Sequence, residues 1–258
     1  RYGMGGLAFT FVPERKKNPL YMKLLVSAYN AEEAEKFDIL GYYRLSQIET
    51  ALGNNTGQEI AVLGTGTQHT YARNFLFNTI YNIEYKGGLE WKGENSENSE
   101  RLHFLQWGIK YQSELFDDKL NEWERLDSSG YSLPYSGQDI ELSKVLKSQN
   151  IIRNDRVQVF VQDGFSIRNE RNEIKISGGV RMTYRSLNKE TFISPRLQIL
   201  YKPHAWSKDI SFKLAGGIYN QVPLYREMRR PDGTINTDLK SQKSIHLVAG
   251  FSYDFTWE

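Results

Sequence analysis

Apolar and polar side chains alternate with a period of two along residues 173–185. The even-numbered positions carry Ile174, Ile176, Gly178, Val180, Met182 and Tyr184. The odd-numbered positions are charged or small, and they include Lys175, Arg181 and Arg185. Successive side chains of a strand point to opposite faces, whereas a helix would scatter both sets around its circumference. The segment therefore predicts a β-strand with one apolar face and one charged face.

The same alternation recurs along most of the chain. It predicts about ten strands, at roughly 2–12, 19–30, 35–48, 68–86, 101–117, 154–168, 173–186, 192–203, 209–219 and 243–257. Residues 31–36 favour a helix but are too few to form a stable one, and no other stretch predicts an amphipathic helix of useful length. Residues 50–68, 117–153 and 220–242 are predicted to be long loops. The predicted fold class is all-β, an antiparallel meander in one domain that spans residues 1–258.

Two architectures accommodate such a meander. A soluble β-sandwich turns the apolar faces of its two sheets toward each other, whereas a membrane barrel turns them outward to lipid around a polar lumen. Several predicted strands are longer than the five or six residues usual in soluble proteins, and short connections alternate with long ones. Aromatic residues also gather near the ends of the apolar rows, at Trp107, Tyr111, Tyr184, Tyr201, Tyr253, Phe255 and Trp257. These features favour a transmembrane barrel, and the sandwich stays the alternative.

Composition excludes several other classes of protein. The 33 Lys and Arg residues nearly balance the 31 Asp and Glu residues, so the chain is not a generic binder of nucleic acid. There is no Cys, which excludes disulfides, Cys-ligated zinc and thiol nucleophiles. The mean hydropathy is −0.58, and no apolar run approaches the roughly 18 residues that a transmembrane helix needs. A transmembrane strand needs only about ten residues with alternate apolar positions, so a membrane location stays open.

No set of residues predicts catalysis or metal binding. His69, His103, His204 and His246 are far apart in the sequence and lack the spacing of metal ligands. Gly64 and Gly66 fall in a predicted loop that no helix follows, so they do not predict a phosphate-binding loop. We therefore expect neither enzymatic activity nor a bound metal or cofactor.

Several short motifs resemble those of a known family. Residues 236–244, which run into 247–251, are similar to the "NPxLKPEKS … ExG" stretch of TonB-dependent outer-membrane receptors, although Thr237 replaces the proline and Ala249 stands where the glutamate would be. Ser194–Arg196, Gly178–Arg181 and Val161–Asp163 resemble the same family's "SPR", "GGxR" and "xQD" strand signatures. Residues 72–74, 127–132 and 221–228 resemble the Bacteroidetes branch of the family, whose members carry an N-terminal carboxypeptidase-regulatory-like domain.

The resemblance implies a location and partners. Members of the family form a plugged barrel of about 22 strands in the outer membrane of Gram-negative bacteria and import a solute. Residues 1–258 would then be a central-to-late part of that barrel, without the plug and the N-terminal domain. The implied partners are outer-membrane lipid, the TonB complex through the plug region, and a surface lipoprotein or other outer-membrane proteins. A receptor-like barrel that serves as a scaffold in a larger assembly is the alternative function.

Two groups of residues are candidates for contact with a solute or a partner. Neighbouring strands present a charged face that we expect to line the lumen, with Lys175, Arg181, Arg185, Arg196 and Lys213. This face either binds a plug and keeps the lumen wet or forms a path for an anionic solute. The predicted extracellular loop at 220–242 supplies the second group, Tyr225, Arg226, Arg229, Arg230 and Asp232. These residues either hold the loop together or contact a solute or a partner protein.

Overall fold

The protein is almost entirely β-strand. A computed structural model describes residues 1–14, 17–93, 99–127, 142–206 and 208–255. The strands are β1 Tyr2–Phe11, β2 Leu20–Ile48, β3 Glu59–Lys92, β4 Ser99–Leu126, β5 Leu142–Asn169, β6 Asn172–Arg185, β7 Glu190–Pro203, β8 Asp209–Gln221 and β9 Gln242–Asp254. A single turn of 3-10 helix, η1, spans Tyr225–Met228. In the part of the chain that the structure describes, no helix has the length and hydropathy needed to cross a membrane.

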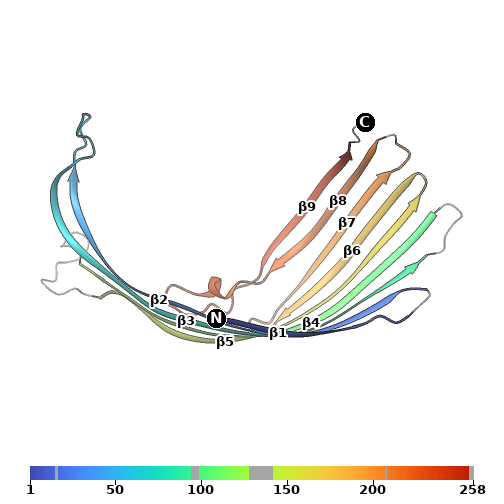
Figure 1. Ribbon diagram of the computed structural model, residues 1–258, viewed down its shortest axis with the longest axis horizontal. Helices are drawn as coiled ribbons and strands as arrows, with labels where there is room; N and C mark the ends of the chain where they lie inside the picture. Colours follow the sequence, from blue (N-terminus) through green and yellow to red (C-terminus); the bar gives the residue numbers. More distant parts are fainter. Residues whose placement is uncertain (15–16, 94–98, 128–141, 207, 256–258) are drawn as a thin grey trace.

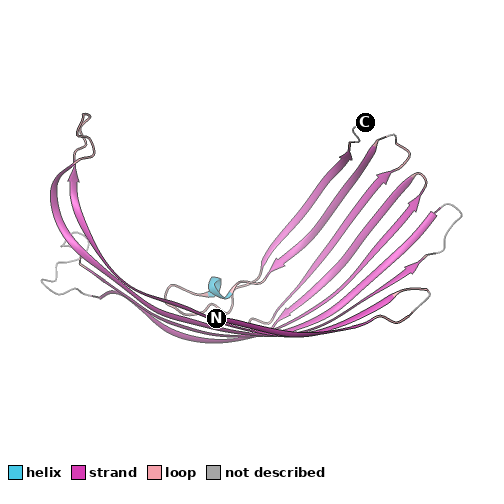
Figure 2. Ribbon diagram, viewed as in Figure 1, coloured by secondary structure: helices cyan, strands magenta, loops and turns pink. Residues whose placement is uncertain are grey.

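The nine strands form one antiparallel sheet in which each strand pairs with its neighbours in the chain, in the order β1 to β9. The predicted all-β antiparallel meander is therefore confirmed. The sheet is strongly curved and open, and β1 and β9 form its two edges (Figures 1 and 2). Each edge strand pairs on one side only within the described residues.

The prediction of about ten strands was wrong by one, because two predicted strands are parts of β2. Residues 31–36 continue the strand, and they pair in order with residues 78 to 73 of β3. Their Ala and Glu side chains have good helix propensity, but propensity is a weak preference that tertiary context overrides. Here the long antiparallel ladder to β3 satisfies the backbone groups and determines the conformation.

Two of the three predicted long loops were also largely wrong. Residues 59–68 belong to β3. Most of 117–153 also forms strands, because β4 continues to Leu126 and β5 begins at Leu142. These extensions carry both polar and apolar side chains on each face, for example Ile60 and Leu63 of β3 and Leu146 and Ile151 of β5, so the regular alternation that predicts a strand is lost there. The third loop is confirmed as residues 222–241, between β8 and β9. The motif residues 128–132 and the end of the last predicted strand, 256–257, lie outside the described residues.

The register of the sheet joins apolar side chains from all nine strands on one face. One row of paired residues contains Leu7, Val26, Ile83, Tyr111, Val157 and Tyr184. Two further rows contain Gly178, Leu197, Gly216 and Leu247, and Ile174, Tyr201, Phe212 and Phe251. Most of these side chains are exposed, as is Val180 on the same face of β6: Val180 is 40%, Leu197 50% and Leu247 80% accessible. We call this continuous surface the apolar band.

The opposite face of the sheet is polar and concave. Segment 222–241, which we call the inner loop, folds back over this face (Figure 1). The largest buried side chains are Arg185, Thr183 and Asp118. The buried apolar cluster is small, and it consists of Ile152 of β5 with Tyr225 and Met228 of the inner loop. The described cluster of buried apolar residues therefore lies beneath the inner loop, and the apolar band is left uncovered by the described residues.

The two ends of the sheet differ. At one end, residues 12–19, 93–98, 170–171 and 204–208 join the strands. At the other end the connections are 49–58, 127–141, 186–189 and 222–241. At this second end, β2 to β5 also extend well beyond the shorter strands β6 to β9 (Figure 1). The sheet thus has a short-loop end and a long-loop end, as the alternation of connection lengths in the sequence predicted.

Candidate functional site

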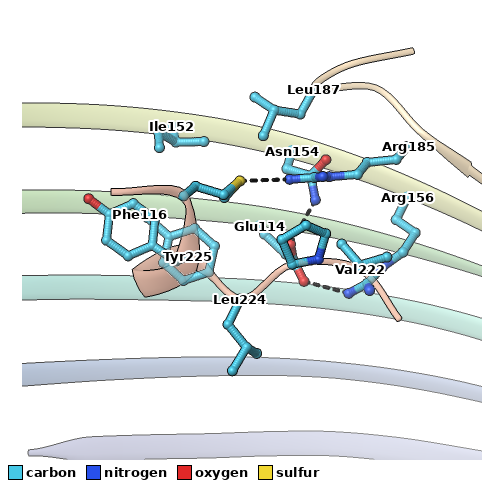
Figure 3. A pocket seen from close by; sticks show the side chains of 12 residues that line it. Glu114, Phe116, Ile152, Asn154, Arg156, Arg185, Leu187, Val222, Leu224 and Tyr225 are labelled. Carbon is cyan, nitrogen blue, oxygen red and sulfur yellow. Dashed lines mark hydrogen bonds and ion pairs between the residues drawn. The ribbon is translucent and has the colours of Figure 1, made fainter. Parts of the chain in front are cut away.

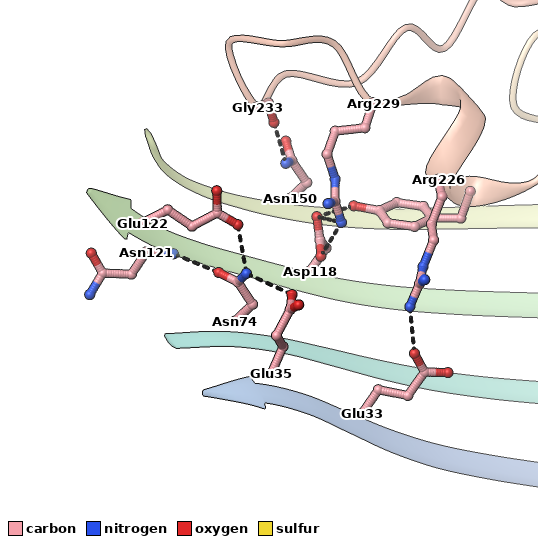
Figure 4. Close-up of polar contacts among 11 residues, drawn as sticks. Glu33, Glu35, Asn74, Asp118, Asn121, Glu122, Asn150, Arg226, Arg229 and Gly233 are labelled. Carbon is pink, nitrogen blue, oxygen red and sulfur yellow. Dashed lines mark hydrogen bonds and ion pairs between the residues drawn. The ribbon is translucent and has the colours of Figure 1, made fainter. Parts of the chain in front are cut away.

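The inner loop is fixed to the concave face around one buried carboxylate, that of Asp118 on β4. The hydroxyl of Tyr225 donates a hydrogen bond of 2.5 Å to Oδ2 of Asp118 (Figure 4). One guanidinium nitrogen of Arg229 donates to both carboxylate oxygens, at 2.8 and 2.9 Å. Asp118 is 1% exposed, so it depends on these donors to offset the cost of burying its charge. Burial, followed by the hydrogen bond to Asp118, raises the pKa of the Tyr225 phenol.

Aromatic and apolar contacts add to this attachment. The ring of Tyr225 stacks on Phe116 of β4, with centroids 5.2 Å apart and planes 12° from parallel. Leu76, Phe116, Leu187, Ile235 and Leu239 pack around the buried cluster. Burying such side chains contributes roughly 1.5–3 kcal/mol each. The inner loop is therefore held by packing as well as by charge.

Two further contacts connect the inner loop to distant strands. Arg226 forms an ion pair of 2.7 Å with Glu33 of β2, and both side chains are largely exposed. The side-chain amide of Asn150 on β5 donates to the carbonyl of Gly233 at 2.8 Å. An exposed ion pair stabilises a fold by roughly 0–1 kcal/mol, so the contact with Glu33 is the weakest of the attachments. The inner loop therefore reaches from β8 across the concave face to β2.

A cavity of about 370 Å³ lies beneath the inner loop. Arg226 and Arg229 line one side, and Glu33, Glu35, Asn74 and Asp118 line the other, together with the apolar residues Ala34, Phe75, Leu76 and Leu120. Asn74 is 8% exposed, and its amide nitrogen donates to Glu35 at 3.2 Å and to Glu122 at 2.6 Å (Figure 4). The cavity thus has an acidic wall from the sheet and a basic wall from the loop. Such a lining suits a small polar solute with both donors and acceptors.

A second, smaller cavity of about 120 Å³ lies between the inner loop and the strands β4 to β6 (Figure 3). Arg156 forms an ion pair of 2.6 Å with Glu114, and Asn154 donates to the other oxygen of Glu114 at 2.8 Å. Arg185 is 1% exposed and donates to the sulfur of Met228 at 3.0 Å and to the carbonyl of Leu239 at 3.4 Å. The Nε atoms of both arginines and Oδ1 of Asn154 lack a hydrogen-bond partner. This cavity is large enough for water molecules that would satisfy them.

The predicted lumen residues share the concave face but do not converge on one site. Arg185 lies in the small cavity, and Lys175 forms an ion pair of 2.6 Å with its neighbour Glu173. Arg181 lies over the ring of Phe160, with the guanidinium carbon 5.7 Å from the centroid, and Arg196 lies 4.4 Å from that of Tyr219. Among the described residues, Lys213 makes no ion pair. Most of these cations therefore have local partners, which is typical of a structural role.

The predicted loop residues divide into two sets. Tyr225, Arg226 and Arg229 contact the sheet, as described above. Arg230 and Asp232 instead organise the loop itself, because the Thr234 amide and hydroxyl donate to Asp232 at 2.9 and 2.7 Å and the Arg230 amide donates to the Thr234 carbonyl at 2.8 Å. The hydrogen bonds from Thr234 also lower the pKa of the exposed Asp232 carboxyl.

The sheet residues that receive the inner loop were not predicted. They are Glu33, Asn74, Phe116, Asp118 and Ile152. Asp118 falls in a segment that was predicted to be a loop. The alternation of Phe116, Asp118, Leu120 and Glu122 on one face is a strand signal, but a mixed face of apolar and acidic residues does not reveal what covers it.

The three strand motifs lie together in the structure. Gln162 pairs with Gly179, and Gly179 pairs with Arg196, so the motifs of β5, β6 and β7 form one patch in register. A Cβ atom at Gly179 would lie 2.9 Å from Cβ of Gln162 and 3.0 Å from the carbonyl oxygen of Val161. The close approach of these strands thus requires glycine at this position.

Three of the four histidines lie near carboxylates. His69 pairs with Asp38 at 2.5 Å, His103 with Asp163 at 3.0 Å, and His204 lies 3.8 Å from Glu173. No group of three or more potential ligands is placed to hold a metal ion within the residues that the structure describes.

A scan against models of known protein families, a search of the curated proteins and a search of the solved structures each find no match to this chain. Function must therefore be inferred from the apolar band, the polar concave face and the inner loop.

We predict that Asp118→Asn loosens the inner loop, because the neutral amide loses the charge-assisted bonds to Tyr225 and Arg229. Bonds to a charged group contribute about 2 kcal/mol, which corresponds to a roughly 30-fold increase in the opening of the loop. Hydrogen–deuterium exchange of the loop amides, such as Gly233 and Asn236, measures this opening.

Asp232→Asn is the matched control, because the partners of Asp232 lie within the loop itself. It should leave the exchange of Asn236 near the wild-type rate. Equal exchange in wild-type protein and in Asp118→Asn would show that packing alone holds the inner loop.

Proposed function

We propose that this chain is an arc of a transmembrane β-barrel in the outer membrane of a Gram-negative bacterium. The observation that carries the proposal is the apolar band, which is continuous in register across nine strands and exposed on every one of them. Soluble proteins rarely expose contiguous apolar patches larger than a few hundred Å². Lipid is the solvent that such a face requires, and the polar concave face then borders the lumen.

The soluble sandwich is the weaker reading. A sandwich needs a second sheet packed on the apolar face, and the described residues form one sheet only. The buried apolar cluster also lies on the opposite, concave face. A sandwich would thus need its second sheet from elsewhere, whereas a barrel needs only lipid.

Within this proposal, the long-loop end faces the cell exterior and the short-loop end faces the periplasm. Barrels of this type have short periplasmic turns and longer extracellular loops. The extensions of β2 to β5 then rise above the membrane, and both of their faces carry polar residues as well as apolar ones. The inner loop folds inward from the exterior and narrows the lumen beside the β2–β6 wall.

The function that we propose is solute import by a TonB-dependent receptor of the Bacteroidetes type, with a barrel of about 22 strands. The resemblance of the strand motifs supports this family, and so does their placement as one patch across β5, β6 and β7. The cavities beneath the inner loop would contact a polar solute that passes between the loop and the sheet. The energy would come from the TonB complex through a plug, and a surface lipoprotein is the expected partner outside the cell.

A receptor-like scaffold is the second candidate, and one observation favours it. The inner loop is attached to four strands, β2, β4, β5 and β6, through Arg226, Arg229, Gly233 and Leu239. A loop that stays in this position obstructs part of the lumen. A scaffold tolerates such an obstruction, whereas a transporter must release it during each cycle.

Capture of the full-length protein by the immobilised periplasmic domain of TonB separates the two candidates. A transporter should be retained from detergent solution and eluted by free TonB domain. A scaffold that has lost coupling should pass through, while an unrelated TonB-dependent receptor, as the positive control, is retained.

We predict that Val180→Arg in the full-length protein reduces barrel formation, because it places a charge in the apolar band. A lipid-facing arginine costs roughly 2–4 kcal/mol near the bilayer midplane. The fraction of protein that migrates as a heat-modifiable folded species after refolding into bilayers measures the effect.

Arg181→Val is the matched control, because its side chain lies on the concave face over Phe160. It loses one cation–π contact and should fold nearly as well as wild type. Similar losses from both variants would contradict the assignment of the two faces.

A further inference from the structure

One edge within the sheet is not covered by the neighbouring strand. β5 begins at Leu142, but its partner β6 ends at Arg185, which pairs with Arg156. Beyond this pair, Asp155 of β5 makes the last hydrogen bonds, to Ser186, the residue that follows β6. The Asp155 carbonyl accepts from the Ser186 amide, and the Asp155 amide donates to the Ser186 hydroxyl, both at 2.8 Å. Residues 142–154 of β5 continue beyond this point and pair only with β4. We call this stretch the free edge.

The direction of the unpaired backbone groups follows from the alternation of an antiparallel strand. The amide and carbonyl of one residue point to the same side, and residues two apart share that side. The backbone amide and carbonyl of Asp155 both point toward β6. The same groups of every second residue before it therefore also point away from β4, at Arg153, Ile151, Gln149, Lys147 and Val145. No backbone hydrogen bond reaches them from any residue that the structure describes.

The rest of the described chain does not cover this edge. The connection between β6 and β7, residues 186–189, turns back at the level of Asp155, so neither strand can extend alongside 142–154. The inner loop lies on the concave face, where Gly233 contacts the side chain of Asn150. The convex side chains stay open, with Val145 62% and Ile151 64% exposed.

The chemistry of the free edge indicates what would bind it. Residues 142–154 contain Lys144, Lys147 and Arg153, no acidic residue, and neither Pro nor Gly. Isolated charges on an edge normally discourage pairing, as do prolines, bulges and short length. Here the edge is long, without proline, and its charges all have one sign. An acidic strand would therefore gain both backbone hydrogen bonds and charge complementarity.

We propose that the free edge of β5 is a docking site for an extended acidic segment of a partner protein, which adds to the sheet as a strand. Addition of a strand uses main-chain hydrogen bonds for affinity and alternate side chains for specificity. Residues 145, 147, 149, 151 and 153 share the convex face of β5, so the segment would place its acidic side chains on that face, beside Lys147 and Arg153, and its apolar side chains on the opposite face. The proposal depends on the proposed function only for placing this edge outside the cell.

The test uses the full-length protein in detergent and a short fluorescein-labelled peptide of alternating Glu and Val. Fluorescence anisotropy should report saturable binding of this peptide and much weaker binding of the matched Lys–Val peptide. A Glu–Val peptide with N-methyl groups on alternate amides keeps the side chains but loses the backbone donors. It should bind about tenfold more weakly or worse.

The protein variant Ile151→Pro removes one outward amide, and an edge position tolerates proline because its N–H has no partner in the sheet. It should also bind the Glu–Val peptide about tenfold more weakly. Lys147→Glu should weaken binding, while Lys175→Glu on β6 should leave it unchanged.

Three results would overturn the proposal: no binding of the Glu–Val peptide, equal binding of the N-methylated peptide, or wild-type binding by Ile151→Pro. The first result includes the case in which other parts of the full-length chain already cover the edge. Heat-modifiable migration of the same preparation reports whether the barrel has formed. Failure of the docking site is thus distinguished from failure of the barrel assignment.

Discussion

The antiparallel backbone ladder between strands adjacent in the chain determines the rest of this structure. Every strand from β2 to β8 has its backbone groups satisfied on both sides over at least part of its length. This ladder sets the register, and the register collects the apolar side chains of nine strands into one band and the polar ones onto the opposite face. A slip of one residue in any pair would exchange the two faces. The apolar band is therefore a consequence of pairing and not of any single side chain.

The inner loop shows how the polar face can still bury a core. Asp118 accepts bonds from Tyr225 and Arg229, and this neutralised group lies beside the apolar cluster of Ile152, Tyr225 and Met228. The burial of the carboxylate and the burial of the apolar side chains depend on each other, because the loop supplies partners for both. The sheet thus provides the site, and the loop completes it.

Sequence reasoning predicted the fold class and most of the strands from β6 to β9, because their apolar alternation is uninterrupted. It predicted 35–48 of β2 as a strand but missed the extensions of β3 to β5 at 59–67, 118–126 and 142–153, since polar and apolar residues occur there on both faces and the regular alternation is lost. It identified Tyr225, Arg226 and Arg229 as candidates, because a basic and aromatic loop is conspicuous. It could not find Asp118 or Glu33, since their pairing with the loop joins residues 111 and 193 positions apart.

The claim that the apolar band contacts lipid can be tested most directly along β6. The chain has no Cys, so single cysteines at 174–182 of the full-length protein can carry a spin label without background from these residues. In bilayers, accessibility to oxygen should be high at Ile174, Ile176, Val180 and Met182, and accessibility to a water-soluble nickel complex should be high at Lys175 and Arg181. A period of two with these phases supports the account. Uniform accessibility, or the opposite phase, would contradict it.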